Sequence, residues 1–252
     1  MFGTERTQRQ LLDTVSCMPS QNRPLLRNRL VESLPAGDRR RLLTECKSVE
    51  LIYAEGLHAP GAKIAHIYFP TTGFISLIMP VSKAAGLEVG LIGNEGMFGF
   101  SLALGVDVSP VRAVVQGAGA ALRMDAAVFN RALGRSKALH RCIDRYVFVQ
   151  LNQLAQTSAC TRFHVVEARL ARWLLMTQDR AGLETFHITQ QFLAAMLGVR
   201  RVGVTKAASS LQRRGMIEYH RGMITVLDRR RLKNASCACY SADLASYERI
   251  LG

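Results

Sequence analysis

ITQQFLAAMLGVRRVGVTKAASSLQRRGMIEYHRGMITVL, residues 188–227, is the stretch that decides the fold of the C-terminal part of the chain. Thr189 is a good N-cap for a first helix, and Gly198 can end that helix with a positive φ. A second helix is expected from about Arg201 to Arg213. Both helices are amphipathic, because apolar residues recur at three- and four-residue spacing: Phe192, Leu193, Met196 and Leu197, then Val204, Ala207, Ala208 and Leu211.

A short hairpin is expected directly after the second helix. Arg214-Gly215 ends the helix, and residues 216–219 and 223–226 have the composition of two strands that flank His220-Arg221-Gly222. The whole stretch therefore predicts a helix-turn-helix followed by a wing.

The outward face of the second helix is basic, rich in hydroxyl groups and free of acids. It carries Arg201, Val202, Lys206, Ser209, Ser210 and Arg213. Residues 188–233 contain ten Lys and Arg against two acids, so this segment holds a net +8 of the chain's +14. Such a helix fits the DNA major groove, where Arg or Lys reads guanine, and Arg221 in the wing can contact a phosphate. The alternative is a helical hairpin with a solvated basic face.

This stretch resembles the winged helix-turn-helix of the Crp/Fnr family of bacterial transcription regulators. The family pattern, laid on residues 198–206, puts the base-reading positions at Arg201, Val202 and Lys206. Val202 departs from the pattern, because many relatives have an acid there that accepts a hydrogen bond from cytosine. An apolar side chain can contact a thymine methyl instead, so a different operator sequence is expected. The remaining expected DNA contacts are Arg200, Ser209, Arg213 and Arg221.

The composition of the chain is compatible with two domains. Its 252 residues are 48% hydrophobic, which is enough for two cores. No apolar run is long enough to span a membrane, and residues 1–24 lack the apolar centre of a secretion signal, so a cytoplasmic protein is expected. The net charge of +14 favours an anionic partner, and the clustering of charge around the helix-turn-helix favours nucleic acid over a membrane.

We expect four segments along the chain. They are a flexible arm over residues 1–24, a sensor β-barrel over 25–135, a dimerisation helix over 136–163 and a winged helix-turn-helix domain over 164–252. Leucines and arginines alternate over residues 25–43, where a break at 34–38 predicts two short helices.

From about Val49, short β-branched and aromatic runs are separated by glycines. The expected strands are 49–53, 65–69, 73–79, 87–92 and 111–115, with turns at 55–56, 60–61, 73, 86, 93–94 and 117. This spacing predicts a jelly roll or double sheet, and with the helices an α+β fold. Residues 59–77 resemble the early strands of the Crp-type sensor barrel, which is a cyclic-nucleotide-binding-like domain. His66 is then a structural barrel residue rather than a ligand, and no histidine has a partner at metal spacing.

The effector cassette departs from that of relatives that bind cyclic nucleotides. Those relatives carry Gly-Glu and then Arg-Ser/Thr-Ala, in which the glutamate holds the ribose and the arginine holds the phosphate. Here Phe100, between Gly99 and Ser101, stands at the glutamate position.

The arginine position departs as well. If Ala113 is the anchor, Val111 occupies that position and Arg112 is one residue out of step, on the opposite strand face with Gln116. We therefore expect that cyclic AMP is not the effector. A changed loop length is the alternative that would restore Arg112 as a phosphate partner.

Residues 136–163 predict one long helix, because they contain no proline or glycine and carry an apolar stripe. The stripe consists of Ile143, Val147, Leu151 and Leu154. The resemblance implies that this helix pairs with its copy in a homodimer, whereas the residues alone leave open that the stripe packs on its own barrel. Nucleotide-binding relatives use a hydroxyl pair on this helix, and an ungapped overlay places Leu154-Ala155 there.

The six cysteines show neither a C-x-x-C pair nor a Cys/His series at zinc spacing. Reduced thiols are expected, and no iron–sulfur cluster, because only Cys17 lies in the N-terminal tail where relatives hold one. Cys237-x-Cys239 is the one close pair, and a single pair cannot fill a four-ligand site. No metal site and no cofactor are therefore expected.

The rest of the C-terminal part predicts two more packed helices. Residues 165–176 form an amphipathic helix with Trp173 in the core. Tyr240, Leu244, Tyr247 and Leu251 fall on one face of a terminal helix that packs on the domain. The alternative for the terminal helix is contact with a partner such as RNA polymerase.

These observations predict a dimeric transcription regulator of the Crp/Fnr type that binds a palindromic site in double-stranded DNA. No nucleophile motif or phosphate loop indicates an enzyme. The alternative is a small-molecule sensor that acts mainly through protein partners and binds DNA weakly. The effector is not indicated by any motif.

Overall fold

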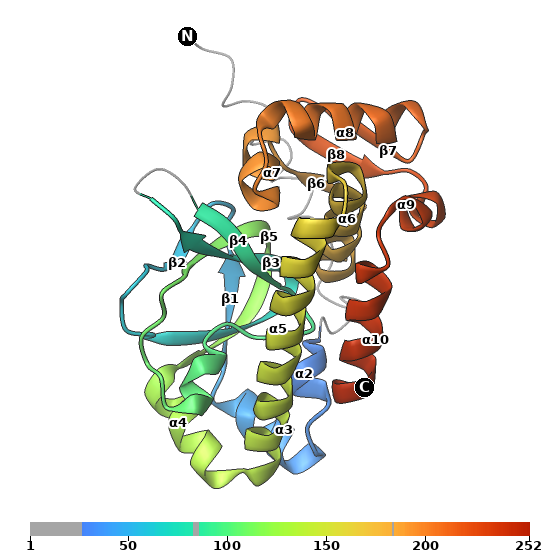
Figure 1. The fold of residues 1–252 in the computed structure, drawn as a ribbon. Coiled ribbons are helices and arrows are strands. Elements are labelled where there is room, and N and C mark those ends of the chain that lie inside the picture. The colour runs from blue at the N-terminus through green and yellow to red at the C-terminus, as the bar shows by residue number, and fades with distance from the viewer. Residues whose placement is uncertain (1–26, 83–85, 183) are drawn as a thin grey trace, which may run out of the picture.

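The computed structural model describes residues 27–82, 86–182 and 184–252. The arm expected over residues 1–24 lies outside the described residues. Two large hydrophobic cores are visible along the chain, one around an antiparallel sheet and one around the helix-turn-helix. A long helix connects them (Figure 1).

Two short helices precede the sheet, as expected. The helix α2 (Arg29–Glu32) begins at Asn28, whose side-chain oxygen accepts from the Val31 amide at 3.1 Å. The Asn28 amide group donates to two sheet-side carbonyls, those of Pro70 at 2.9 Å and Gly96 at 2.8 Å. The helix α3 (Ala36–Thr44) starts within the expected break, directly after Pro35. Asn28 thus anchors the start of the described chain to the barrel.

The sheet is antiparallel and has the order β1-β5-β3-β4, with β2 also paired to β5. Its strands are β1 (Lys47–Leu51), β2 (Gly56–His58), β3 (His66–Pro80), β4 (Gly86–Ile92) and β5 (Arg112–Asp125). The α+β class with an N-terminal antiparallel sheet is confirmed. His66 begins β3, and its Nε2 lies 3.2 Å from the Asp125 carboxylate of the neighbouring strand.

Three expected turns in this region are wrong. The runs 65–69 and 73–79 form the single strand β3, and Gly117 lies inside β5. Gly86 begins β4. Gly73 has a φ of +69° and sits where the β3–β5 register shifts, so it bends a continuing strand instead of ending it. A glycine in a strand marks a bulge or a close backbone approach as readily as a turn.

Helices follow the last strands of the sheet and continue the chain beyond it. The 3-10 helix η1 (Phe100–Leu104) follows the β4 turn, and α4 (Ala126–Arg135), which we did not expect, follows β5. The long helix is confirmed as α5 (Lys137–Phe163), capped by Ser136, whose hydroxyl accepts from the Leu139 amide at 3.0 Å. Its 27 residues span about 40 Å at 1.5 Å each.

The C-terminal part combines helices and a small sheet around the second core. It contains α6 (Val166–Ala181), β6 (Thr185–His187), α7 (Gln190–Leu197), α8 (Arg201–Arg213), β7 (Ile217–His220), β8 (Met223–Val226), α9 (Arg229–Ala235) and α10 (Cys239–Leu251). The small sheet has the order β6-β8-β7, and β6 is an addition to the expected hairpin.

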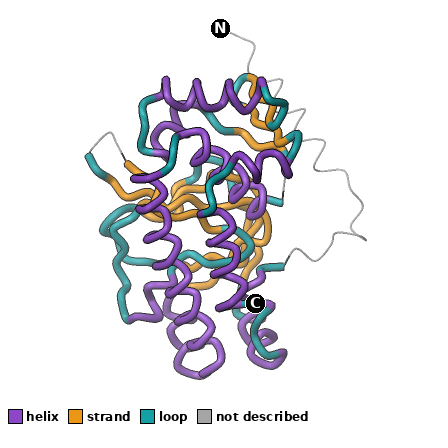
Figure 2. The backbone as a smooth tube through the Cα atoms, turned by 45° about the vertical axis from the view of Figure 1, so that its right-hand side comes forward, coloured by secondary structure: helices purple, strands orange, loops and turns teal. Residues whose placement is uncertain are grey.

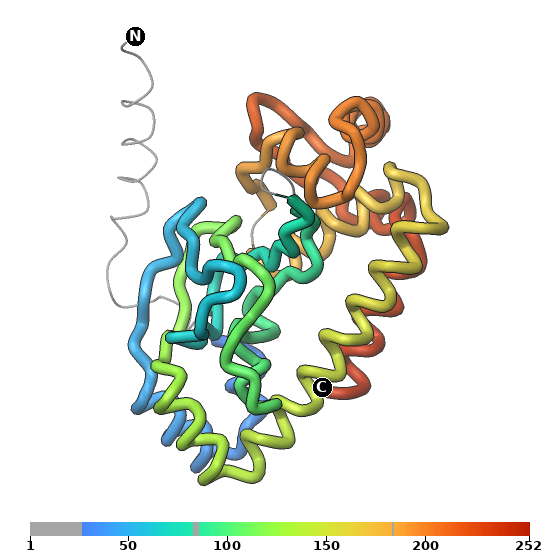
Figure 3. The backbone as a smooth tube through the Cα atoms, turned by 60° about the vertical axis from the view of Figure 1, so that its left-hand side comes forward, coloured from blue at the N-terminus to red at the C-terminus, as the bar shows by residue number. Residues whose placement is uncertain are grey.

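The terminal helix α10 runs back along α5 in the opposite direction (Figures 1 and 3). Tyr240 and Tyr247 are buried as expected, but Leu244 is 44% exposed. Asp243 takes its place in the interface, because it pairs with Arg172 of α6 at 2.6 Å. No helix among the described residues is long and apolar enough to cross a bilayer.

Figure 2 shows how helices surround the sheet on several sides.

Candidate DNA-binding surface

The two helices of the helix-turn-helix have the expected bounds and caps. The Thr189 hydroxyl accepts from the Phe192 amide at 3.1 Å and begins α7. Gly198 ends α7 with a φ of +61°, a conformation that glycine adopts without a Cβ penalty. The inward residues Val204, Ala207, Ala208 and Leu211 of α8 are all buried. Local sequence therefore specifies this unit almost completely.

The outward face of α8 is open to solvent. Arg200, Arg201, Val202, Lys206, Ser209 and Arg213 are all exposed. Figure 1 shows α8 at the outer end of the molecule, on the side away from the large sheet. The barrel does not cover this helix, so the surface is accessible in the described conformation.

The basic side chains of this surface are not paired with acids in the described part of the chain. None of the salt bridges between described residues involves Arg200, Arg201, Lys206, Arg213 or Arg221. Gln190 of α7 accepts from Thr205 at 2.9 Å and from Arg201 Nε at 3.4 Å. That amide therefore orients Arg201 without cancelling its charge.

The wing is a tight hairpin. Arg221 and Gly222 both have positive φ, 48° and 83°, so they form a two-residue turn of the kind that suits twisted strands. His220 belongs to β7, which makes the turn one residue shorter than expected. The Tyr219 hydroxyl donates to the Ile188 carbonyl at 2.8 Å and fixes the wing against the start of α7. Arg221 is exposed at the wing tip.

A buried polar contact joins the helix-turn-helix part to the barrel. Trp173 of α6 donates from Nε1 to Glu88 of β4 at 2.8 Å, and the Ser76 hydroxyl of β3 also donates to Glu88. Trp173 is buried as expected. Burial raises the pKa of Glu88 to about 7, although both hydrogen bonds and the nearby Arg180 guanidinium act in the opposite direction. The interface therefore contains a carboxyl group that titrates near neutrality.

Glu95 of the cassette turns toward the same interface. It pairs with Arg180 of α6 at 2.7 Å, and both side chains are buried. Arg180 also donates to the Leu91 carbonyl at 3.1 Å. The sequence predicts an amphipathic α6, but nothing in its spacing shows that Trp173 and Arg180 contact β4 and the following turn.

The cassette positions lie in different surroundings. Phe100 packs edge-on against Tyr146 of α5, with ring centroids 5.8 Å apart, so an aromatic contact fills the place of the glutamate. Leu154 lies eight residues beyond Tyr146 on α5, about 12 Å further along, and is 43% exposed. Of the other candidates, Gly99 is buried and caps η1, and Ser101 is half-buried.

The strand part of the cassette shows the expected alternation. Arg112 is exposed, Ala113 and Val115 are fully buried, and Val111 is half-buried. Gln116, expected on the face of Arg112, is buried as well, and its Oε1 has no partner among the described residues. Arg112 therefore does not point into the core around the sheet.

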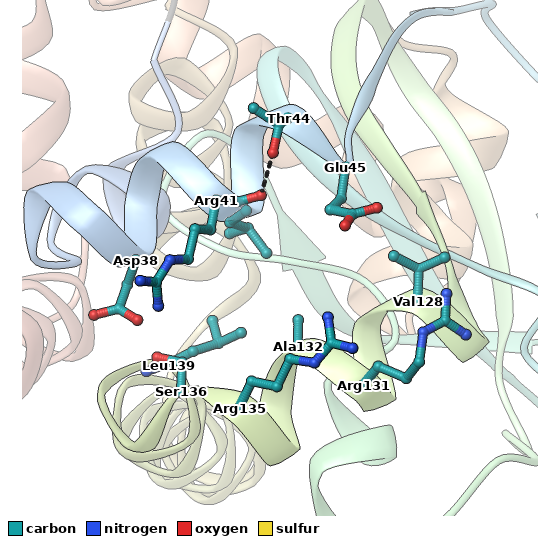
Figure 4. A pocket seen from close by; sticks show the side chains of 11 residues that line it. Asp38, Arg41, Thr44, Glu45, Val128, Arg131, Ala132, Arg135, Ser136 and Leu139 are labelled. Carbon is teal, nitrogen blue, oxygen red and sulfur yellow. Dashed lines mark hydrogen bonds between the residues drawn. The ribbon is translucent and has the colours of Figure 1, made fainter.

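Two cavities of the structure lie elsewhere. One of about 390 Å³ lies between Arg29, Glu95, Arg180, Asp243 and Tyr247, at the junction of barrel, α6 and α10. Another, of about 170 Å³, opens between α3, α4 and the start of α5. Figure 4 shows its lining, which includes Asp38, Arg41, Glu45, Arg131 and Arg135. Of the cassette candidates from Gly99 to Leu154, none lines either cavity.

The apolar stripe of α5 divides between two environments. Ile143 is fully buried in the core of its own chain and Val147 is half-buried, so Ile143 cannot contact a second copy. Leu151 and Leu154 are exposed, at 60% and 43%, and Phe148, which we did not single out, is 52% exposed. The exposed residues of the stripe therefore lie in the second half of α5, because its first residues pack on the core around the sheet.

The close pair Cys237 and Cys239 is joined in the structure by two residues from the end of α5. Cys160 and His164 bring their ligand atoms to the pair, and the four atoms lie within 4.8 Å of one another. Although no histidine has a partner at metal spacing in the sequence, the fold brings His164 close to three cysteines. Sequence spacing missed the group because its halves lie more than seventy residues apart.

Known proteins share this architecture. Residues 168–235 match the family model of the Crp-like helix-turn-helix domain. FixK2 from Bradyrhizobium japonicum superposes with a TM-score of 0.65 at 16% identity, over 77% of this chain and 98% of that one. The c-di-GMP-responsive global regulator CLP from Xanthomonas campestris has a TM-score of 0.61 at 16% identity, over 76% and 99%. A Crp-family transcriptional regulator from Thermus thermophilus has a TM-score of 0.60 at 16% identity, over 75% and 96%.

No curated protein matches the chain by sequence. The fold nevertheless defines a class, that of two-part proteins with an N-terminal antiparallel sheet and a C-terminal winged helix-turn-helix. Within that class, residues 168–235 match the Crp-like helix-turn-helix domain, and the fold of the chain is similar to that of the solved structures named above.

Proposed function

We propose that this protein is a homodimeric, sequence-specific DNA-binding transcription regulator that works in the cytoplasm. The observation that carries the proposal is the exposed face of α8, whose basic side chains form no salt bridge with a described acid. A cationic helix of this kind binds DNA favourably, because the phosphates that it contacts release their counterions. Its Arg and Lys side chains can also reach the edges of guanine bases.

Within this proposal the residues have two kinds of role. Arg201, Val202 and Lys206 read bases from α8. Arg200, Ser209, Arg213 and Arg221 contact the phosphate backbone and position the helix. Val202 is 59% exposed, which suits contact with a thymine methyl group.

Dimerisation would supply the second recognition helix. The exposed residues Phe148, Leu151 and Leu154 of α5 give an apolar strip for a second copy. Two copies related by a two-fold axis would place their α8 helices in successive major grooves, so a palindromic site is expected.

The effector proposed here is not cyclic AMP. Arg112 is exposed, and Phe100 fills the glutamate position by packing on Tyr146. A cyclic phosphate in the barrel would thus lack the buried arginine that its charge requires. Isothermal titration with cyclic AMP should show no binding, and tight binding that is lost in Arg112→Ala would contradict this part.

The DNA experiment compares two arginine variants on a site selected from random fragments. Arg201→Ala should weaken the selected site by about 1–3 kcal/mol and relax its sequence preference, because it removes a base contact. Arg221→Ala should weaken selected and random DNA alike and reduce the slope of affinity against salt by about one. Arg131→Ala, an exposed arginine on α4, is the matched control and should change neither.

Two outcomes would contradict the proposal. Equal losses on selected and random DNA for both variants would refute the division of roles. Failure to select any preferred palindrome, with affinity that barely depends on salt, would favour the alternative of a sensor that acts through protein partners. The proposed regulator would also contact RNA polymerase. Co-purification of the protein with the polymerase on promoter DNA tests this contact.

A further inference from the structure

Four potential metal ligands meet where α5 ends and α10 begins. Cys160 lies in the last turn of α5 and His164 caps that helix. Cys237 lies between α9 and α10, and Cys239 is the first residue of α10. The Cys160 and Cys237 sulfurs are 3.4 Å apart, and Cys239 Sγ lies 3.5 Å from His164 Nδ1.

These distances are those of a tetrahedral site. Bond lengths of about 2.3 Å for zinc to sulfur and about 2.0 Å for zinc to nitrogen separate two sulfurs by about 3.8 Å and a sulfur from a nitrogen by about 3.5 Å. All four ligand atoms lie within 4.8 Å of one another, which leaves room for one ion among them. The sulfur atoms of Cys160 and Cys237 are too far apart for a disulfide, which needs about 2.05 Å.

The surroundings suit a structural zinc ion. The three cysteines are buried, at 2%, 8% and 3% exposure for Cys160, Cys237 and Cys239, and His164 is half-buried at the rim, which leaves a path for the ion. Three thiolates, one neutral imidazole and Zn²⁺ carry a net charge of −1.

Neighbouring side chains can compensate that charge. Arg169 and Arg172 of α6 both interact electrostatically with Cys160. Gln156 donates from Nε2 to Cys239 Sγ at 2.9 Å, as outer residues do for metal-bound thiolates.

We propose that Cys160, His164, Cys237 and Cys239 bind one Zn²⁺ ion in a closed tetrahedral site. The three thiols release their protons to solvent as the ion binds, and His164 coordinates through Nδ1 as neutral imidazole. Four protein ligands leave no open position, so the site is structural rather than catalytic.

The position of the site gives it a second consequence. Only His164 and Val165 separate α5 from α6, the first helix of the helix-turn-helix part. An ion held by α5 and by the start of α10 would therefore fix the angle at which that part leaves α5. This consequence rests on the proposed function, because it makes the position of α8 depend on zinc.

Metal analysis of the full-length protein tests the site without any DNA. Protein purified under reducing conditions should contain about one zinc per chain, whereas Cys237→Ser and Cys239→Ser should contain almost none. Cys46→Ser, a half-buried cysteine outside the group, is the matched control and should keep its zinc. Cobalt in place of zinc should give the visible bands of a tetrahedral thiolate complex in wild type and Cys46→Ser only.

A milder variant separates loss of the zinc site from loss of the fold. Gln156→Ala removes only the hydrogen bond to Cys239, and it should bind zinc about 10–100-fold more weakly in competition with a chelator while keeping its helical circular dichroism. Wild type without zinc and without cobalt bands, equal zinc in all variants, or a Cys160–Cys237 disulfide as the state of the purified protein would each overturn the proposal.

The effect of zinc on the connection between α5 and α6 can be measured separately. Removal of zinc by a chelator should lower the Tm and reduce affinity for the selected DNA site, and added zinc should restore both. Zinc that binds as predicted in a protein that selects no DNA would leave the metal site standing and refute only the proposed regulator.

Discussion

Substitution of Glu88 should change how the stability of this protein depends on pH. The carboxyl group is buried between Ser76 of β3 and Trp173 of α6, and its pKa is raised from 4.5 to about 7. A carboxyl group with a raised pKa binds its proton more tightly in the folded chain than in the unfolded chain. Its contribution is therefore complete below pH 4.5 and falls as the pH rises toward 7.

The size of the effect follows from the two pKa values. The free energy changes in proportion to the difference between them, so the complete effect is about 3 kcal/mol, most of which falls between about pH 5 and pH 8. Glu88→Gln keeps an acceptor for Trp173 and cannot ionise. The free energy of unfolding of the variant should thus decline less with pH than that of wild type, by about 2–3 kcal/mol over this range.

Urea denaturation at several pH values between about 5 and 8 measures this difference. The variant Glu218→Gln, at an exposed acid in the wing, serves as the control and should follow wild type throughout. The reasoning is refuted if Glu88→Gln and wild type lose stability in parallel, because Glu88 would then ionise in the folded chain as readily as in the unfolded one.

Three further predictions concern the cap, the dimer and the strand bend. Thr189→Ala should lower the free energy of unfolding by about 1 kcal/mol, measured by urea denaturation, since it removes the N-cap of α7. Leu151→Glu should shift the protein toward monomer in analytical ultracentrifugation, whereas Arg141→Glu, on the exposed surface nearer the start of α5, should not. Gly73→Ala should destabilise by more than about 1 kcal/mol in thermal unfolding, because its φ is positive and a Cβ would meet the backbone of Gly117.

Elements with strong local signals could be predicted from the sequence. Thr189 and Gly198 define the two ends of α7, and the apolar spacing from Val204 to Leu211 with Arg214-Gly215 after it defines α8. The absence of proline and glycine over 136–163 predicts α5 within one residue. In each case neighbours three or four positions apart carry the information, so no knowledge of the rest of the fold is needed.

The ends of strands are harder to predict than the ends of helices, because a glycine can mark a turn, a bulge or a close approach of two strands. Gly73 and Gly117 read as turns, yet they lie close together on neighbouring strands of one sheet and allow these strands to approach and bend. Which use applies depends on the partner strand, and its register is a tertiary property.

The sequence by itself determined the helix-turn-helix, its wing and the outward direction of its basic face, because periodicity and capping act within a few residues. Only the tertiary structure decided which residues of the α5 stripe are exposed and that Glu88 accepts a hydrogen bond from Trp173. It alone also decided that Cys160 and His164 lie beside Cys237 and Cys239. These contacts join segments far apart in the chain, and close packing of the two cores, rather than any local preference, brings them together.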